Sequence, residues 1–459
     1  MNLFRSVLTL LGLFLFVDVV RAAEPPAKPN IVFILADDLG YGDLGCYGQT
    51  KIRTPHLDKL AADGIRFTHC YSGSTVCAPS RCTLITGLHT GHCRVRGNGG
   101  FFLNAEDVTV AKLLHDAGYA TGVIGKWGLG DPGTAGVPSK QGFDEFFGFL
   151  NHTHAHNYYP DFLWRHETKV PLNNVVEKGV ASKRVEYAPD LFTKEALAFV
   201  EANKSKPFFL YFAPTLPHAN NERTKLDGGG NEVPSDEPYT SEKWPQPEKN
   251  KAAMITRLDA DIGKLLAKLA ELGLEENTIV IFASDNGPHK EGGNDPAFFT
   301  SSGPFRGIKR SLTDGGIRVP GIVRWKGVAK ADTVSPHVWA FWDFLPTACD
   351  LAGLKTPSGL DGVSFAPTIT GKGMQTTHDF LYWEFHENGS KQAVRYKDWK
   401  AIRPAPGKPL LLYDTKTDVT ESNDVASKYP KVIETIEGYL KTARTESKDF
   451  PLKPPPEKK

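Results

Sequence analysis

The stretch of the chain with the clearest chemical signature is a short run that holds a cysteine and an arginine. Residues 77–81 read CAPSR, and the apolar residues that follow them recur at helical spacing. Pro79 suits the first turn of a helix, whose free N–H groups and positive dipole end favour an anion. The run therefore predicts that Cys77 lies with Arg81 at an anion-binding helix start. A small buried or disulfide-bonded cysteine before a proline-capped helix is the alternative.

Oxygen-bearing side chains follow two of the most apolar runs in the sequence. Asp37 and Asp38 come directly after residues 30–36, and Asp285 and Asn286 follow a later run of the same kind. Both runs are rich in β-branched residues and apolar on both faces, as buried parallel strands are. Carboxylate and amide oxygens suit a hard divalent cation, calcium or magnesium, and zinc is disfavoured. Adjacent aspartates at a helix cap or turn are the alternative.

Two basic side chains also stand at the ends of predicted strands. Lys126 follows residues 119–125, and His218 follows residues 207–213 after a short loop. Parallel strands place their carboxyl ends at one edge of a sheet, which is where open α/β sheets bind ligands. We therefore expect the lysine, the histidine and the four oxygen-bearing residues to meet near Cys77.

Alternating strands and helices must position these groups. They alternate over about three hundred residues, which indicates an α/β fold with a mostly parallel central sheet flanked by helices. From Gly371 short strand-like runs follow one another, which predicts a small antiparallel sheet of four strands with one closing helix. The predicted strands are residues 30–36, 65–70, 119–125, 207–213 and 278–284, then 380–385, 392–396, 399–403 and 410–414; the main predicted helices are 54–64, 108–117, 191–200, 252–272 and 431–443.

The start of the chain has the pattern of a secretory signal. One basic residue precedes an apolar run, Val7 to Val20, that is too short to cross a bilayer. We expect residues 1–22 to be a cleaved signal peptide, an uncleaved membrane anchor being the alternative. The rest should form a catalytic domain at 23–370 and a C-terminal subdomain at 371–459. No later stretch could cross a membrane, so the protein is expected to be secreted or periplasmic.

Composition narrows the range of partners. The 459 residues carry 54 Lys and Arg against 53 Asp and Glu without a basic patch, so neither nucleic acid nor a membrane surface is an expected partner. A hydrophobic content of 40% and an aromatic content of 11% support a substantial core. The six cysteines have spacings that fit no zinc site, and disulfides among them are compatible with export.

Seven motifs, in order along the chain, resemble those of the arylsulfatase-A-like, type I (formylglycine-dependent) sulfatases of the alkaline phosphatase superfamily. Seven ordered motifs are far more specific than any one of them. They are ADDLGYGDLGCYG at 36–48, CAPSR with TG at 86–87, GKW at 125–127, PH at 217–218, SDNG at 284–287, FRGIK at 305–309 with GGIRVP at 315–320, and LYD at 412–414.

The resemblance implies that a formylglycine-generating enzyme oxidises Cys77 to formylglycine after synthesis. The hydrate of this aldehyde attacks sulfur, and loss of a proton from its second hydroxyl then expels sulfate. The resemblance also implies roles for other residues: one calcium ion, or magnesium, is held by Asp37, Asp38, Asp285 and Asn286; Arg81 and Lys126 brace the formylglycine and the sulfate; His218 and Lys309 bind the sulfate and protonate the leaving oxygen. A metal ion and fixed cations suit a reaction that builds negative charge.

One position departs from the family pattern. Family members commonly carry a histidine two residues after the motif lysine, and this histidine assists the expulsion of sulfate. Here that position is Gly128, which has no side chain for the task. The nearest candidates are His152, His154 and His156, and we predict that His154 takes the role and contacts the substrate. A histidine in a surface loop is the alternative.

The preferred function is hydrolysis of sulfate esters, on sulfated carbohydrates or aryl sulfates. The aromatic-rich segment 151–166 is a candidate sugar-binding wall, and Trp383, Glu384 and His386 are candidates to close the pocket, with plain packing as the alternative for all of them. Phosphoester hydrolysis on the same fold is weaker, because such enzymes usually use Ser or Thr with two zinc ions. The other alternative is a glycan-binding relative that has lost turnover, for which Gly128 is the only support.

Overall fold

The main element of the structure, a computed structural model, is a ten-stranded sheet in the order β12-β2-β11-β10-β1-β9-β3-β4-β5-β6. The structure describes residues 28–456, so the predicted signal peptide at 1–22 lies outside the described residues. The strand bounds are β1 Asn30–Ala36, β2 Ile65–Tyr71, β3 Ala120–Lys126, β4 Glu145–Phe149, β5 Phe162–Arg165, β6 Thr168–Pro171, β9 Phe208–Ala213, β10 Thr278–Ser284, β11 Arg318–Arg324 and β12 Thr333–Ala340, and the separate pair β7 Val175–Glu177 and β8 Val180–Lys183.

The centre of the sheet is parallel. Strands β10, β1, β9, β3 and β4 run in one direction, and β12 is parallel to β2. β11, β5 and β6 pair antiparallel with their neighbours. The predicted α/β fold with a mostly parallel central sheet is confirmed. Strand β11 was missed in the sequence, because its run RVPGIVR contains Pro320 and Gly321, which ordinarily interrupt strands.

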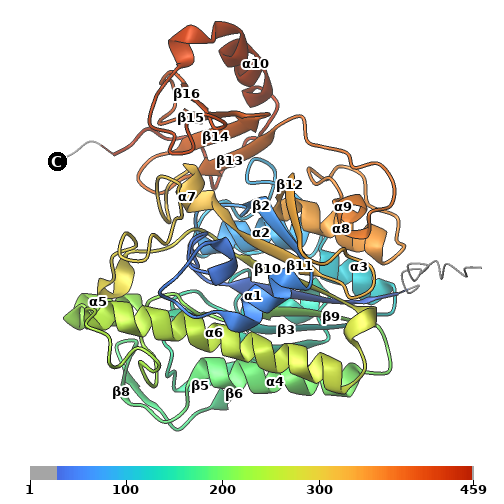
Figure 1. Cartoon of the computed structure of the whole chain (residues 1–459), viewed down its shortest axis with the longest axis vertical. Helices are drawn as coiled ribbons and strands as arrows, with labels where there is room; N and C mark the ends of the chain where they lie inside the picture. Colours follow the sequence, from blue (N-terminus) through green and yellow to red (C-terminus); the bar gives the residue numbers. More distant parts are fainter. Residues whose placement is uncertain (1–27, 457–459) are drawn as a thin grey trace, which may run out of the picture.

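Strand β1 shows why the sheet needs helices on both faces. All seven of its residues are buried: alternate side chains face opposite cores, with Phe33 in one and Ile34 in the other. Helices α1, α4 and α6 cover the core that holds Ile34, and α2, α3 and α8 cover the core that holds Phe33 (Figure 1). The helix bounds are α1 Pro55–Ala62, α2 Cys77–Thr86, α3 Val110–Asp116, α4 Ala188–Asn203, α5 Asn221–Asp227, α6 Gln246–Glu271, α7 Asp314–Ile317, α8 Phe344–Leu351, α9 Ala366–Thr370 and α10 Pro430–Leu440.

A second, four-stranded antiparallel sheet lies at one end of the molecule with α10 packed against it (Figure 1). Its strands are β13 Leu381–Phe385, β14 Lys391–Tyr396, β15 Trp399–Arg403 and β16 Leu411–Asp414. This is the small antiparallel sheet with one closing helix that the sequence predicts. The indole N–H of Trp383 donates to the carbonyl of Ser72 at 2.9 Å, and its ring packs against Tyr71 and Trp342. Apolar and hydrogen-bonded contacts therefore join this sheet to the main body.

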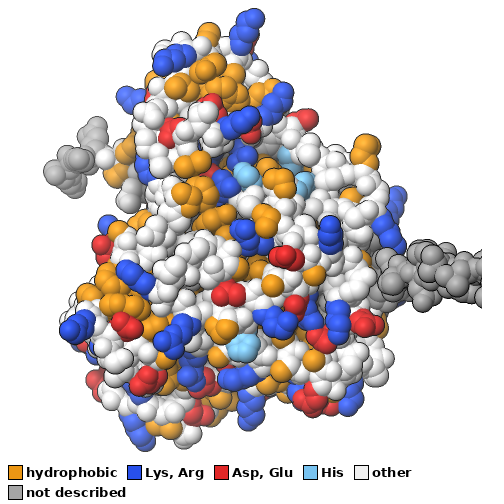
Figure 2. Space-filling view, in the orientation of Figure 1, with side chains coloured by type: hydrophobic (Ala, Val, Ile, Leu, Met, Phe, Trp, Pro, Cys, Tyr) orange, Lys and Arg blue, Asp and Glu red, His pale blue; other side chains and the backbone are white. Residues whose placement is uncertain are grey.

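The described part of the chain has neither a membrane-spanning helix nor, on the face shown (Figure 2), a surface patch of one charge. Within residues 28–456, no helix combines the length and the apolar character needed to cross a bilayer. On the face shown in Figure 2, Lys and Arg side chains lie among Asp and Glu side chains rather than in a patch of one sign. This mixture agrees with the net charge of +1.

Candidate active site

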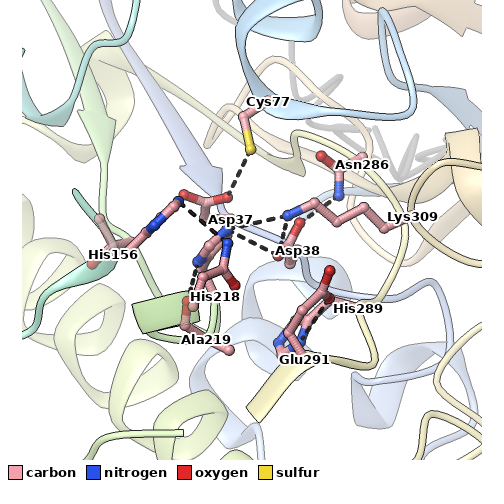
Figure 3. Close-up of polar contacts among 12 residues, drawn as sticks. Asp37, Asp38, Cys77, His156, His218, Ala219, Asn286, His289, Glu291 and Lys309 are labelled. Atoms are coloured by element: carbon pink, nitrogen blue, oxygen red, sulfur yellow. Dashed lines mark hydrogen bonds and ion pairs between the residues drawn. The ribbon is translucent and has the colours of Figure 1, made fainter. Parts of the chain in front are cut away.

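The strand ends that carry polar side chains meet at one edge of the main sheet. The backbone N–H of Asp37 donates to the carbonyl of Leu216, and that of Asp285 donates to the carbonyl of Ala36, both at 3.0 Å. These bonds tie the loop after β9 and the end of β10 to the end of β1. The predicted residues that this edge brings together, several of which appear in Figure 3, are Asp37, Asp38, Cys77, Arg81, Lys126, His218, Asp285, Asn286 and Lys309.

Cys77 is the first residue of α2 and points at the carboxylates. Its Sγ lies 3.7 Å from Asp37 Oδ1, and only 3% of the residue is exposed (Figure 3). Burial raises the pKa of the Cys77 thiol to about 12, although Lys126 and Lys309 act to lower it. The thiol is therefore protonated at neutral pH. An unmodified Cys77 is a poor nucleophile, because the thiolate is the reactive form.

Two lysines keep Asp37 and Asp38 charged. Lys126 Nζ donates to Asp37 at 2.7 Å, and Lys309 Nζ donates to Asp38 at 2.8 Å. Burial by itself would raise the pKa of each carboxyl. The neighbouring lysine ammonium nevertheless holds the pKa of each below its usual value. Both groups are therefore available as anionic oxygen ligands.

Asp285 and Asn286 are the members of the cluster that a bound cation would stabilise most directly. Arg81 donates to Asp285 at 2.8 Å, yet burial and then the charge of Asp37 raise the pKa of Asp285 to about 7. Asn286 Oδ1 is buried and has no hydrogen-bond partner in the described part of the chain. A divalent cation would lower the pKa of Asp285, because it favours the charged carboxylate. It would also give Asn286 Oδ1 a partner, because an amide oxygen is a suitable ligand. The residues therefore fit one hard cation.

His218 lies beside this cluster and does not complete it as a zinc ligand set. One ligand atom each from Asp37, Asp38, Cys77 and His218 lie within 4.8 Å of one another. However, His218 Nδ1 lies 2.6 Å from a backbone carbonyl, so it carries the proton, and Nε2 lies 3.1 Å from Lys309 Nζ, from which it accepts. Both ring nitrogens are thus engaged. His218 therefore lies in the wall of the site, and the oxygen-bearing side chains are the candidate ligands for a cation.

These side chains open onto a cavity of about 360 Å³ whose wall includes Cys77, Lys126, His218 and Lys309. Asn98 and Arg310 are among the wall residues that were not singled out in the sequence. Asn98 Oδ1 accepts from the N–H of Ala78 at 3.1 Å in the first turn of α2, and nothing in its glycine-rich surroundings signals this. Arg310 also lines the cavity, and its only signal is that it follows the motif lysine.

The three histidines of the 152–156 segment take different places. His154 packs against two phenylalanine rings, with centroid distances of 4.9 and 4.4 Å, and it does not line the cavity. The prediction of His154 as the substitute for the missing family histidine is therefore corrected, because apolar packing holds its ring away from the site. His152 and His156 do line the cavity, and His156 stacks on His218 with centroids 5.0 Å apart.

The predicted aromatic wall is mostly packing. Tyr158 is 1% exposed, and its hydroxyl donates to the carbonyl of Thr215 at 2.8 Å, which braces the loop that carries His218. Trp383 and Glu384 are buried where the two sheets meet, and neither lines the cavity. The idea that these side chains close the pocket is wrong, because they serve the joint between the sheets. None of the six cysteines, all within residues 28–456, forms a disulfide.

Comparison with known families gives two matches. The family described as Sulfatase matches residues 29–354, and the one described as N-sulphoglucosamine sulphohydrolase, C-terminal, matches residues 306–446. The first match contains every residue of the cation cluster and the cavity wall named above. The second reaches through the four-stranded sheet and α10.

Individual proteins match over most of their length. N-acetylgalactosamine-6-O-sulfatase of Bacteroides thetaiotaomicron is 30% identical, with 91% of this chain and 93% of the relative covered. Arylsulfatase A of Homo sapiens is 31% identical, with 89% and 86% covered. Among solved structures, Ps i-CgsB in complex with k-i-k-neocarrahexaose superposes with a TM-score of 0.76 at 28% identity, with 91% of this chain and 93% of that chain covered. The similarity therefore extends across both sheets.

Proposed function

This chain belongs to the sulfatase family and is a sulfuric ester hydrolase, and we propose that it cleaves sulfate esters of carbohydrates through a formylglycine made from Cys77. A formylglycine-generating enzyme would be its partner during maturation. One calcium ion, or magnesium in its place, would be held by the oxygen ligands Asp37, Asp38, Asp285 and Asn286.

The placement of Cys77 is the observation that carries this proposal. Its thiol is buried and protonated, yet it faces Asp37 in a wall that also holds Lys126 and Lys309. The lysines suit an anionic substrate, whereas burial keeps the thiol protonated and therefore unreactive. A formylglycine at position 77 supplies a hydrated aldehyde whose oxygen is the nucleophile. The bound cation supplies electrostatic stabilisation for the oxygens of the sulfate ester.

Fixed cations of the chain hold the reacting groups in place. Arg81 donates to Asp285 and to the carbonyl of Lys126, so it fixes the strand end from which Lys126 projects. The Lys126 ammonium lies in the cavity wall with Cys77 and would contact a sulfate oxygen there. Positive charge held in place before the reaction lowers the barrier more than mobile charge does, because it needs no reorganisation.

The proton for the leaving oxygen would come from the pair His218 and Lys309. Lys309 Nζ lies 3.1 Å from His218 Nε2, and both side chains line the cavity. The lysine carries three N–H donors, so it can contact Asp38, the histidine and a substrate oxygen together. We assign to this pair the binding of sulfate and the donation of a proton to the departing alcohol.

The substrate class is proposed from the size of the cavity and from the relatives. A cavity of about 360 Å³ is at the small end for a ligand site and suits one sulfated sugar ring. One relative is named for a sulfated N-acetylgalactosamine, and one solved neighbour was crystallised with a neocarrahexaose. We therefore propose a sulfated glycan as the natural substrate. Simple aryl sulfates are small enough to serve in assays.

Replacement of Cys77 tests this proposal directly. Cys77→Ala and Cys77→Ser, made in a host that converts the motif cysteine, should fold like the wild type and lose turnover of an aryl sulfate and of sulfated sugars. The reason is that neither residue can be converted to the aldehyde by the cysteine-directed pathway. Mass spectrometry of the wild-type peptide that contains position 77 should show loss of the sulfur atom and reaction with a hydrazide.

The matched control is Cys349→Ala on α8, a buried cysteine that does not line the cavity and should keep its turnover. An unmodified thiol at position 77 in fully active protein, or wild-type turnover in Cys77→Ala, would refute the formylglycine.

Export is part of the same proposal. A secreted or periplasmic enzyme would meet sulfated polysaccharides outside the cytoplasm, and residues 1–22 have the pattern of a cleaved signal. The N-terminal sequence of mature protein from the native host should begin at Ala23. A mature protein that still begins at Met1 would contradict this.

A further inference from the structure

The space beside Gly128 is filled by another side chain. A Cβ atom on Gly128 would lie 2.9 Å from Cε1 and 3.0 Å from Nδ1 of His152, so the imidazole would have to shift to make room for it. The two segments run side by side, because Gly128 N–H donates to the carbonyl of Leu150 at 3.0 Å and Trp127 N–H donates to Phe149 at 2.9 Å. The imidazole of His152 therefore occupies the place where a side chain at position 128 would begin.

The His152 ring also belongs to the proposed active-site cavity. It lines the same wall as Cys77 and Lys126. Both of its ring nitrogens are buried, and neither has a hydrogen-bond partner within residues 28–456. A buried polar atom without a protein partner is costly, so both ring nitrogens are available to bond a group that enters the cavity. His156 differs, since its Nδ1 is 2.9 Å from Glu222.

From this placement we infer that His152 is the base that releases sulfate from residue 77, the task for which Gly128 has no side chain. The inference rests on the proposed function. A nitrogen of His152 removes the proton of the hydroxyl on the Cβ of residue 77. The O–H electron pair becomes the second bond of the aldehyde C=O. The Cβ–O bond to sulfate breaks, and sulfate leaves with the electron pair of that Cβ–O bond. The proton stays on the imidazole until solvent takes it.

The charges around His152 keep its ring neutral before sulfate binds, as a proton acceptor must be. Burial first, and then the cations Lys126 and Arg81 with His156, lower the pKa of His152 to about 3, and Asp37 opposes them. The resting imidazole is therefore neutral and has a nitrogen free to accept a proton. The negative charge of bound sulfate favours the protonated ring, so the basicity of His152 rises when sulfate occupies the cavity.

The first experiment separates the two halves of turnover. In mature enzyme, His152→Ala should show a burst of product of wild-type rate followed by a steady state slowed by about 100-fold or more, the usual effect of losing a general base. The peptide that contains residue 77 should then carry a bound sulfate in its mass spectrum. The control is His154→Phe, which keeps an aromatic ring packed outside the cavity. It should show neither the slowed steady state nor the sulfated peptide. Wild-type steady-state turnover in His152→Ala, or sulfated peptide in His154→Phe alone, would overturn the inference.

The second experiment uses unmodified protein, so it does not depend on formylglycine or on activity. Thermal unfolding is compared for wild type, Gly128→His, His152→Ala and the double variant. If the two side chains compete for one space, Gly128→His lowers the Tm more when His152 is present than when it is absent. Equal falls in Tm would show that His152 is not where the inference needs it. If Cys77→Ala keeps its turnover but the Tm values show competition between positions 128 and 152, the proposed function is wrong. The position of His152 beside Gly128 would still hold.

Discussion

At the scale of single residues, we expect Asp285 to be the carboxyl on which the proposed cation site depends most. Its raised pKa of about 7 comes from burial and from Asp37, so it gains more than its neighbours from a bound cation. Asp285→Asn keeps the oxygen and removes the charge. We expect the variant to lose the stoichiometric calcium or magnesium of the wild type, seen by elemental analysis of dialysed protein, and to lose activity with it.

The matched control for the cation is Asp144→Asn. Asp144 accepts from Thr121 N–H at the far end of β3 from Lys126, so its loss should leave the metal content unchanged. Two zinc ions per wild-type chain would contradict the single hard cation and favour a phosphatase-like site.

Arg310 is the second residue that merits a test. It has a φ of 72°, which costs a non-glycine residue on the order of 1 kcal/mol. Its guanidinium donates to Glu291 at 2.6 Å and to Glu387 at 2.9 Å, and the residue lines the cavity. Arg310→Gln should raise the KM for a sulfated sugar by about tenfold, equivalent to 1.4 kcal/mol, with little change in kcat, because the cavity loses a cation that attracts the anionic substrate.

Initial rates over a range of substrate concentrations measure both constants for Arg310→Gln. Arg94→Gln, a surface change outside the cavity, is the control and should alter neither. A fall in kcat at constant KM would instead place Arg310 in contact with the transition state.

At the scale of elements, a buried carboxylate joins β13 to two distant segments. Glu384 is paired with Arg96 at 3.0 Å and with Arg444 at 2.9 Å. Burial by itself would raise the pKa of Glu384, but the hydrogen bond from His386 and the two arginines lower it to about 2. The pairing therefore links the segment after α2 and the C-terminal segment to the small sheet.

A lowered carboxyl pKa makes stability depend on pH in a defined direction. The contribution of Glu384 is present above its ordinary pKa of 4.5 and is lost as the pH falls toward 2. This shift corresponds to about 3 kcal/mol. Urea unfolding of wild type and Glu384→Gln should differ by roughly that amount at pH 6 and converge near pH 2.

The exposed Glu106 provides the control for this titration, and Glu106→Gln should match the wild type at every pH. A difference between wild type and Glu384→Gln that stays constant from pH 6 to pH 2 would show that the ionised form is not what the arginines stabilise.

At the scale of the whole molecule, the two sheets share a buried joint. Tyr71 and Trp342 of the main body pack against Trp383, and Lys400 of β15 donates to Asp314 at 2.9 Å. We propose a boundary between a catalytic domain at 23–370 and a C-terminal subdomain at 371–459. A fragment ending at residue 370 would expose these aromatic rings and leave the buried Asp314 without its lysine.

We therefore expect the 23–370 fragment to bind a hydrophobic dye and to lack the cooperative thermal unfolding of the 23–459 chain. Calorimetry of both proteins under one condition makes the comparison. A fragment that unfolds cooperatively at the Tm of the longer chain would show that the main body does not need the small sheet.

The sequence by itself determined the architecture and the edge at which the site lies. Runs such as 30–36 and 278–284 are rich in β-branched residues and apolar on both faces, which is typical of buried parallel strands. Because parallel strands end together, the polar residues after them had to meet, whatever the loops do. Ordered motifs then indicated the sulfatase family, and both inferences depend on local patterns that one chain displays in full.

Only the tertiary structure decided which loop side chains enter the site. His152 and His154 are two residues apart and chemically identical, yet packing against two phenylalanine rings holds His154 away while His152 fills the space beside Gly128. Strand β11 was missed because Pro320 and Gly321 argue locally against a strand, whereas its pairing with β10 and β2 in the folded protein overrides them. The direction of a loop side chain and the pKa of a buried group are set by contacts between segments far apart in sequence, which no local pattern records.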